Sequence, residues 1–119
     1  MSSLFGGKSR EDREAEQQQQ QQRQQSLARQ FEPLVTRALE QLTRWAFPDS
    51  QVEYNGAAAW SLWHNADDGQ KYVDVTVTVE FNGDTPEYFE CQTQNHSDNT
   101  DSLTREDLND TLRWVICRS

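Results

Sequence analysis

Apolar and polar residues alternate between Tyr72 and Phe81 more regularly than anywhere else in the chain. A branched aliphatic or aromatic side chain occupies every second position from Val73 to Phe81, and polar residues fill the positions between. A period of two is typical of a β-strand with one buried and one solvent-facing side, and β-branched residues favour strands over helices. We therefore predict a long strand over residues 72–81, around which the rest of the fold is organised.

Three further stretches share this period and are expected to pair with that strand. Val52 and Tyr54 predict a short first strand, residues 57–64 a second and residues 87–94 a fourth, with turn residues between them. The polar residues 95–101 predict a loop. The four strands are therefore expected to form an antiparallel meander.

The register follows from keeping the large apolar side chains together on one side of the sheet. In the hairpin of the second and third strands, the predicted pairs are Leu62 with Val73, Trp60 with Val75 and Trp63 with Tyr72. In the next hairpin we expect Phe81 opposite Glu87, which leaves Pro86 in the loop because proline cannot donate to the ladder.

Helical periodicity flanks the strands on both sides. Apolar residues recur at helical spacing from Leu27 to Ala46, and Pro33 within them predicts a kinked or re-started helix. Thr104 and Asp107 form a variant of the capping box, so a last helix is expected to begin there. The predicted fold is α+β: helix, four-stranded antiparallel meander, helix, as a two-layer sandwich with both helices on one sheet face, over residues 27–119.

Residues 1–26 have a different composition. Every residue at positions 17–25 except Arg23 is glutamine, and the segment offers almost no apolar side chain to bury. Ser9 with Asp12 resembles a capping box, so a frayed, solvated helix is one expectation and a flexible tail is the other. Oligomerisation through the glutamines is less favoured, because a coiled coil needs an apolar seam.

Charge is unevenly distributed along the 119 residues. Residues 1–30 carry a net charge of +1, whereas residues 31–119 hold six basic and sixteen acidic residues, a net charge of −10. Such a domain repels nucleic-acid phosphates and anionic membranes, so neither is an expected partner. We expect a basic protein as the partner instead. The chain has no apolar run near the ~18 residues of a membrane span and no apolar signal-peptide core, so we expect a cytoplasmic protein.

Several candidate sites have ordinary structural explanations. His96, Asp98 and Asp101 share one polar loop, but their spacing matches no tight chelating pattern, so no metal or cofactor is expected. Cys91 is expected to point into the core, where a thiol stays protonated and unreactive. Since the chain has only two cysteines, a disulfide framework is not expected.

The solvent-facing side of the sheet is the most informative candidate. The predicted register gathers aromatic residues there with an acidic border: Trp63, Tyr72 and Tyr88 beside Asp74, Glu80 and Glu90. Trp114 lies off the apolar stripe of the last helix and could add a second contact. Exposed aromatics with an acidic rim are typical of a surface that recognises a basic, partly apolar protein.

The leading hypothesis is a non-catalytic interaction domain that binds a protein partner through this face. An acidic inhibitor, an immunity-type protein or a chaperone-like protein for a basic partner is the first alternative, and the size and acidity are similar to those of bacterial secretion chaperones. The element order resembles that of double-stranded-RNA-binding domains, but Thr104-Arg105-Glu106-Asp107 is mostly acidic where that family is basic. The second alternative is a small hydrolase or metal-dependent enzyme, which predicts an enclosed pocket around His64 or His96.

Overall fold

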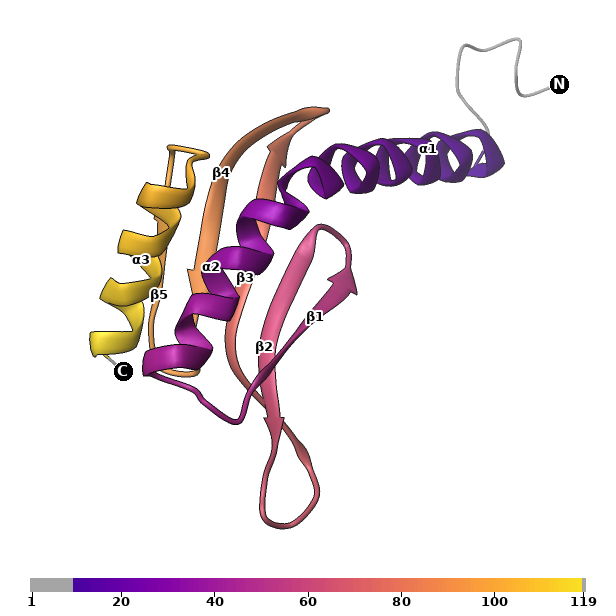
Figure 1. The fold of residues 1–119 in the computed structure, drawn as a ribbon. Helices are drawn as coiled ribbons and strands as arrows, with labels where there is room; N and C mark the ends of the chain where they lie inside the picture. The colour runs from indigo at the N-terminus through magenta and orange to yellow at the C-terminus, as the bar shows by residue number, and fades with distance from the viewer. Residues whose placement is uncertain (1–9, 119) are drawn as a thin grey trace, which may run out of the picture.

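The computed structural model describes residues 10–118 and contains helices at both ends of one sheet-forming segment (Figure 1). The elements are α1 (Arg10–Ala28), the short 3₁₀ helix η2 (Arg29–Phe31), α2 (Glu32–Trp45), β1 (Gln51–Gly56), β2 (Ala59–Asn65), β3 (Lys71–Asn82), β4 (Thr85–Gln92), β5 (Ser97–Thr100) and α3 (Arg105–Arg118). The strands form one antiparallel sheet in the order β1-β2-β3-β4-β5. The α+β class is as predicted, but the sheet has five strands and not four.

The additional strand, β5, lies in the segment that was predicted to be a loop. It pairs with β4 from Phe89 opposite Thr100 to Gln92 opposite Ser97. Its four residues are all polar, so the sequence contains no alternation of apolar side chains that would predict a strand here. β5 is an edge strand whose place is fixed by backbone pairing, which the sequence pattern does not report.

The alternating residues of β3 are oriented as predicted from Val75 to Val79. Val73 was predicted to lie on the same buried side, but it is exposed because the pairing with β2 shifts at Asp74. Val75, Val77 and Val79 are at most 2% exposed, whereas Thr76 and Thr78 between them are only partly buried. The valines share one core cluster with these buried residues of β2, β4, α2 and α3: Trp60, Leu62, Phe89, Cys91, Val35, Leu39, Leu42, Leu108, Leu112 and Val115. In Figure 1, α2 and α3 both lie in front of the sheet.

The predicted register of β3 and β4 is confirmed along most of the hairpin. Val79 lies opposite Phe89 and Glu80 lies opposite Tyr88. The prediction was wrong at the turn, because a bulge after Glu80 pairs Phe81 with Pro86 and brings the proline into the ladder. Pro86 is the second residue of β4, near a strand end where a missing backbone donor is tolerated.

The first helical segment is interrupted as predicted. η2 separates α1 from α2, and Pro33 lies in the first turn of α2. Backbone N–H groups in a first turn have no partner within the helix, so the absence of an N–H in proline costs no hydrogen bond there. α1 is a mostly exposed helix whose Arg23 forms an ion pair with Asp84 in the β3–β4 turn at 3.2 Å. Ser9 and the side chain of Asp12 lie outside the described residues. Within residues 10–118, no helix is long and apolar enough to cross a membrane.

The capping box of α3 is confirmed. The Asp107 backbone N–H donates to Thr104 Oγ1 at 3.3 Å, and the Thr104 hydroxyl donates to the Asp107 carboxylate at 3.0 Å. Hydrogen bonds from the side chains of Ser102 and Thr104 hold the pKa of Asp107 below its ordinary value. A charged Asp107 therefore fixes the beginning of α3.

Candidate protein-interaction face of the sheet

The side of the sheet opposite the buried valines is called the outer face here. Its residues alternate with the core positions along the strands: Glu53 and Asn55 on β1, Ser61 and Trp63 on β2, Thr76, Thr78 and Glu80 on β3, Tyr88 and Glu90 on β4, and Asn99 on β5. Most of these side chains are partly exposed.

A β-bulge changes which residues share the outer face. Leu62 lies opposite Val75 and Trp63 lies opposite Val73, so Asp74 is an extra residue on β3. The predicted pairs of Leu62 with Val73, Trp60 with Val75 and Trp63 with Tyr72 are therefore wrong. A bulge shifts side chains to the other side of the strand, so Tyr72 lies opposite His64, with the two rings 5.2 Å apart.

Asp74 is held by the bulge in a small polar cluster away from the outer face. Its carboxylate accepts a hydrogen bond from the Ser50 hydroxyl at 2.6 Å and contacts Nδ1 of His64 at 2.9 Å, and its side chain is only 6% exposed. In a hydrolase triad the serine contacts the imidazole, but here Ser50 and His64 contact the same carboxylate oxygen. The cluster ties the α2–β1 loop to β3 and does not activate Ser50.

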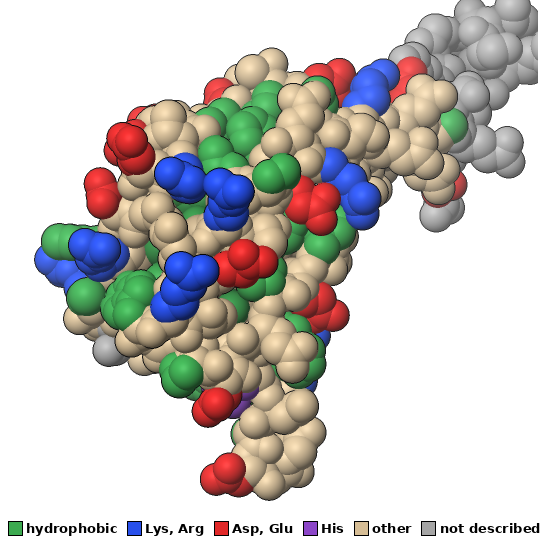
Figure 2. All heavy atoms as spheres, viewed as in Figure 1, with side chains coloured by type: hydrophobic (Ala, Val, Ile, Leu, Met, Phe, Trp, Pro, Cys, Tyr) green, Lys and Arg blue, Asp and Glu red, His purple; other side chains and the backbone are tan. Residues whose placement is uncertain are grey.

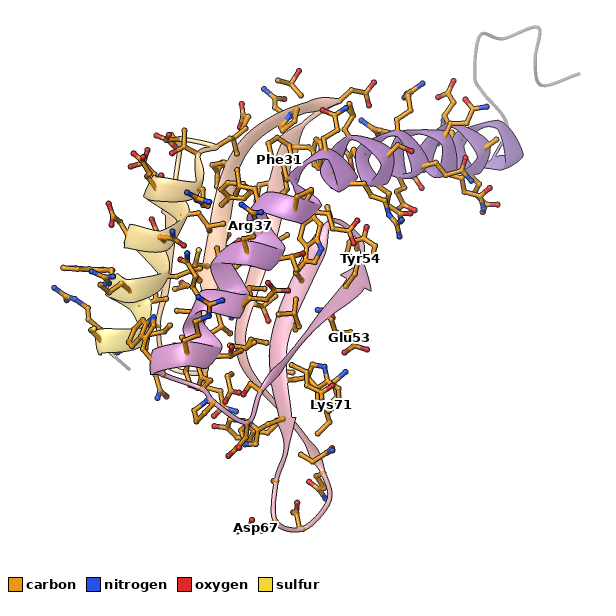
Figure 3. All side chains as sticks on the ribbon, in the orientation of Figure 1. Phe31, Arg37, Glu53, Tyr54, Asp67 and Lys71 are labelled. Carbon is orange, nitrogen blue, oxygen red and sulfur yellow. The ribbon has the colours of Figure 1, made fainter. Side chains whose placement is uncertain are left out.

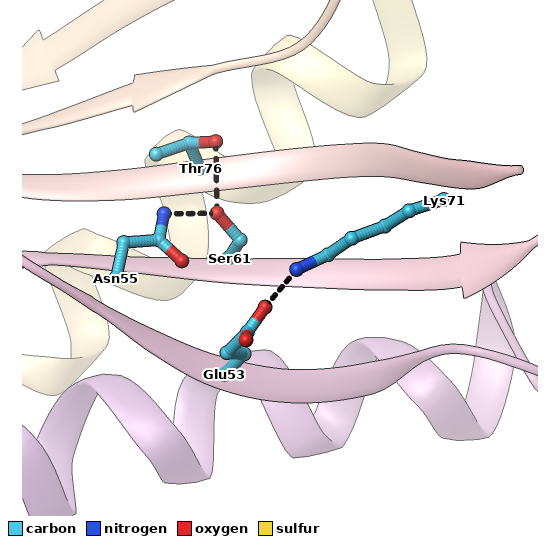
Figure 4. A network of polar contacts seen from close by, with 5 residues as sticks. All are labelled: Glu53, Asn55, Ser61, Lys71 and Thr76. Carbon is cyan, nitrogen blue, oxygen red and sulfur yellow. Dashed lines mark hydrogen bonds and ion pairs between the residues drawn. The ribbon is translucent and has the colours of Figure 1, made fainter.

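The β1–β2 half of the outer face has its charges and polar groups paired. Lys71 forms an ion pair with Glu53, and its ammonium lies 4.7 Å from the centre of the Trp63 ring. Asn55 donates a hydrogen bond to Ser61 Oγ at 2.5 Å, and Ser61 contacts Thr76 Oγ1 at 3.4 Å (Figure 4). Trp63 is therefore covered by a cation of the same chain and is not an open aromatic contact.

The β3–β5 half of the outer face is acidic, and its strands from position 72 onward carry no Lys or Arg. Burial raises the pKa of Glu80 above its ordinary value, and a hydrogen bond and repulsion from Glu90 on the neighbouring strand raise it further. Partial burial also raises the pKa of Tyr88, as does the negative charge of four nearby carboxyl groups, those of Glu80, Glu90, Glu87 and Asp101. We call Glu80, Glu87, Tyr88, Glu90 and Asp101 the acidic half-face.

The charges of the domain are segregated between the sheet and the helices. Residues 46–104 hold eleven acidic residues and one basic residue, Lys71, a net charge of −10, whereas α2 and α3 are each neutral. Figure 2, on the side where the helices lie, shows several Lys and Arg side chains over that region. No Lys or Arg occurs between positions 72 and 104, so the acidic half-face has no neutralising partner on its own strands.

The structure thus divides the predicted site residues into three groups. Glu80, Tyr88 and Glu90 lie together on the outer face, and Trp63 lies on its other half. Tyr72 and Asp74 belong to the Ser50–His64 cluster, which only a knowledge of the bulge could have revealed. Trp114 is half-exposed on α3 with the Arg118 guanidinium 3.7 Å from its ring centre, so it is not part of the sheet surface.

The other candidate residues stand apart from this face. Within residues 10–118, no three His, Cys, Asp or Glu side chains gather closely enough to hold a metal ion. His96 is exposed in a tight turn with Thr93, and its backbone N–H donates to Thr93 Oγ1 at 3.1 Å. Burial, with the charges of Asp98 and Glu90, raises the pKa of the Cys91 thiol to about 12, so this thiol is neutral near pH 7.

Comparison with known proteins gives no relative from which a role could be transferred. No protein-family model, no curated protein and no solved structure matches the chain. The functional inference therefore depends on the geometry and charge of the surface.

Proposed function

We propose that the chain is a non-catalytic interaction domain that binds a basic segment of another protein through the acidic half-face. The observation that carries this proposal is the placement of Glu80 and Glu90 as diagonal neighbours beside Tyr88, in a stretch of sequence, residues 72–104, that has no Lys or Arg. A Lys or Arg of a partner placed between them would relieve their repulsion and complete their hydrogen bonds.

The surroundings of the two carboxyl groups support a protein partner. Tyr88 supplies an aromatic surface between the acids, and Tyr is enriched among residues that dominate protein interfaces. The shared core of the valine row, α2 and α3 supports a two-layer arrangement that leaves the outer face free for a partner. A cytoplasmic location belongs to the same proposal and is supported by two free cysteines.

An acidic inhibitor, immunity-type or chaperone-like role would use the same face on a basic partner. The segregation of −10 charge units onto residues 46–104 favours this class as the second candidate, because complementary charge accelerates association with a cationic enzyme. The two candidates differ in consequence: an inhibitor abolishes its partner's activity at stoichiometric amounts, and an interaction domain leaves that activity intact.

Binding of a fluorescein-labelled peptide of alternating Lys and Thr tests the proposal. We expect the chain to bind this peptide at low ionic strength. The affinity at the acidic half-face, read from the shift of the Tyr88 backbone amide signal, should fall about tenfold, or about 1.4 kcal/mol, in the double variant Glu80→Gln/Glu90→Gln. Raising the salt toward ~0.15 M should weaken the binding by the wild-type chain, because screening shortens the reach of surface charges.

The matched control removes two acidic charges elsewhere. Asp67→Asn/Asp68→Asn changes the net charge equally but alters only the exposed β2–β3 loop, so its affinity should stay within about twofold of wild type. Equal weakening by the two double variants would show that the peptide senses net charge alone, and the proposed face would then be wrong.

A further inference from the structure

A groove separates α2 from β1, the strand at one edge of the sheet, and no residue of the acidic half-face lines it. A polar stripe of α2 forms one wall, and Tyr54 of β1 (labelled in Figure 3) and Trp60 of β2 also line the groove. The α2 stripe consists of Glu32, Thr36, Glu40 and Thr43. These residues recur at helical spacing beside the apolar stripe that α2 buries in the core.

Two residues that line the groove each have a buried polar atom with no hydrogen-bond partner in the described part of the chain. These atoms are the indole Nε1 of Trp60, whose residue is only 1% exposed, and the hydroxyl of Tyr54. The two rings are in contact, with centroids 5.1 Å apart. Buried donors in folded proteins are nearly always paired, so a buried indole N–H that lacks an acceptor, on a residue that lines a groove, points to an acceptor supplied from outside the chain.

The walls of the groove favour a positively charged occupant. Neither Glu32 nor Glu40 forms an ion pair in the described part of the chain. Arg29 contacts an aromatic residue of the groove and neither glutamate, with its guanidinium 5.2 Å from the centre of the Tyr54 ring. That leaves the two carboxylates of α2 available to a cation of another molecule.

β1 also offers unpaired backbone groups along the groove. Within residues 10–118, β1 pairs only with β2, so alternate residues turn their N–H and C=O groups away from the sheet. The opposite edge strand, β5, is shorter and wholly polar, as protected edges commonly are. β1 is six residues long and carries Val52 and Tyr54, so it is the edge better suited to accept a further strand.

We propose that an extended, basic segment of a partner protein adds to β1 as a sixth strand. One Lys or Arg of the segment enters the groove between Glu32 and Glu40, and an oxygen of the segment accepts the hydrogen bond of the Trp60 indole N–H. The adjacent side of the same segment faces Glu53 and Asn55. The site shares no residue with the acidic half-face, so either can fail without the other.

The Trp60 indole N–H gives a direct NMR readout in the full ¹⁵N-labelled chain. On titration with an acetylated, amidated peptide of alternating Lys and Thr, we expect this signal and the amides of residues 51–56 to shift more than those of Thr78 and Glu90. Glu32→Gln/Glu40→Gln should weaken the affinity measured from the Trp60 indole signal about tenfold, whereas Glu80→Gln/Glu90→Gln should leave the shift of that signal unchanged.

A second peptide tests strand addition itself. Methylation of every backbone nitrogen of the peptide removes the donors that a sixth strand needs on both of its edges, so the methylated peptide should not shift the β1 amides. Equal binding of both peptides, shifts confined to the acidic half-face, or no shift of the Trp60 indole at millimolar peptide would each overturn the proposal. If the β1 amide signals shift when the protein concentration is raised without peptide, the groove binds a second copy of the chain. That result would also overturn the proposal.

Discussion

Glu80 and Glu90 are diagonal neighbours on two adjacent strands, and burial and the nearby Glu90 carboxyl group raise the pKa of Glu80. β3 and β4 impose this proximity, because Glu80 lies opposite Tyr88 and Glu90 lies opposite Thr78 two residues away. Diagonal neighbours on one face of an antiparallel pair are close enough for long side chains to meet. The fold therefore holds the two carboxyl groups together, even though their charges repel.

Stability should depend on pH through Glu80. Its pKa in the folded chain is raised above the ordinary value of 4.5, so the folded state binds this proton more tightly than the unfolded state. The corresponding stabilisation is full below the unfolded pKa and is lost as the pH rises through the folded pKa. Glu80→Gln should therefore raise the melting temperature relative to wild type at pH 7, and the gain should shrink as the pH falls toward 4.

Calorimetry of both proteins between pH 4 and 7 measures this difference. Asp67→Asn is the control, because it removes one acidic charge from an exposed loop position and should show a smaller change at every pH. A Glu80→Gln gain that is the same at pH 4 and pH 7 would contradict the raised pKa.

The Asp74 cluster should contribute to stability and not to catalysis. Asp74→Ala leaves the Ser50 hydroxyl and His64 Nδ1 without their acceptor, so we expect a loss of about 1–3 kcal/mol in the free energy of unfolding. Urea denaturation, monitored by circular dichroism, measures this loss of free energy. Asp67→Ala, in the exposed β2–β3 loop, should change the free energy by less than about 0.5 kcal/mol. Identical urea midpoints for the two variants would show that the cluster does not hold the loop.

The two cysteines should differ sharply in reactivity. Cys91 is buried with a thiol pKa of about 12, whereas Cys117 is exposed near the end of α3. Because the thiolate is the reactive form, iodoacetamide at pH 8 should alkylate the folded chain once, at Cys117. Mass spectrometry of the intact chain and of its peptides counts and locates the adduct. Alkylation of Cys91 as fast as Cys117 would mean that β4 opens readily.

The interior of the sheet was predictable from the sequence, because burial imposes a period of two on β3. That period also fixed the pairing of Val79 with Phe89, since any odd slip would have turned the core residues outward. β5 was not predictable, because its polar residues carry no such signal and only pairing with β4 defines them.

The bulge at Asp74 shows why the predicted site was only partly correct. An extra residue leaves the alternation of the sequence intact, so the pattern continued through Asp74 while the pairing shifted at that point. Because of this shift, Tyr72 lies next to His64 and not next to Trp63 as predicted. Glu80, Tyr88 and Glu90 lie beyond the bulge, in the part of the sheet where the predicted register was correct, and they remain together.

Zero-length cross-linking tests most directly whether the acidic half-face binds a basic segment. A carbodiimide joins a carboxylate to a lysine only where the two are in contact, and mass spectrometry locates each bond. With the peptide of alternating Lys and Thr, we predict bonds to Glu80 and Glu90 well above those to Asp67 and Asp68, which are exposed and acidic but lie in the distant β2–β3 loop. Bonds to Asp67 and Asp68 that are as frequent as those to Glu80 and Glu90 would contradict the account.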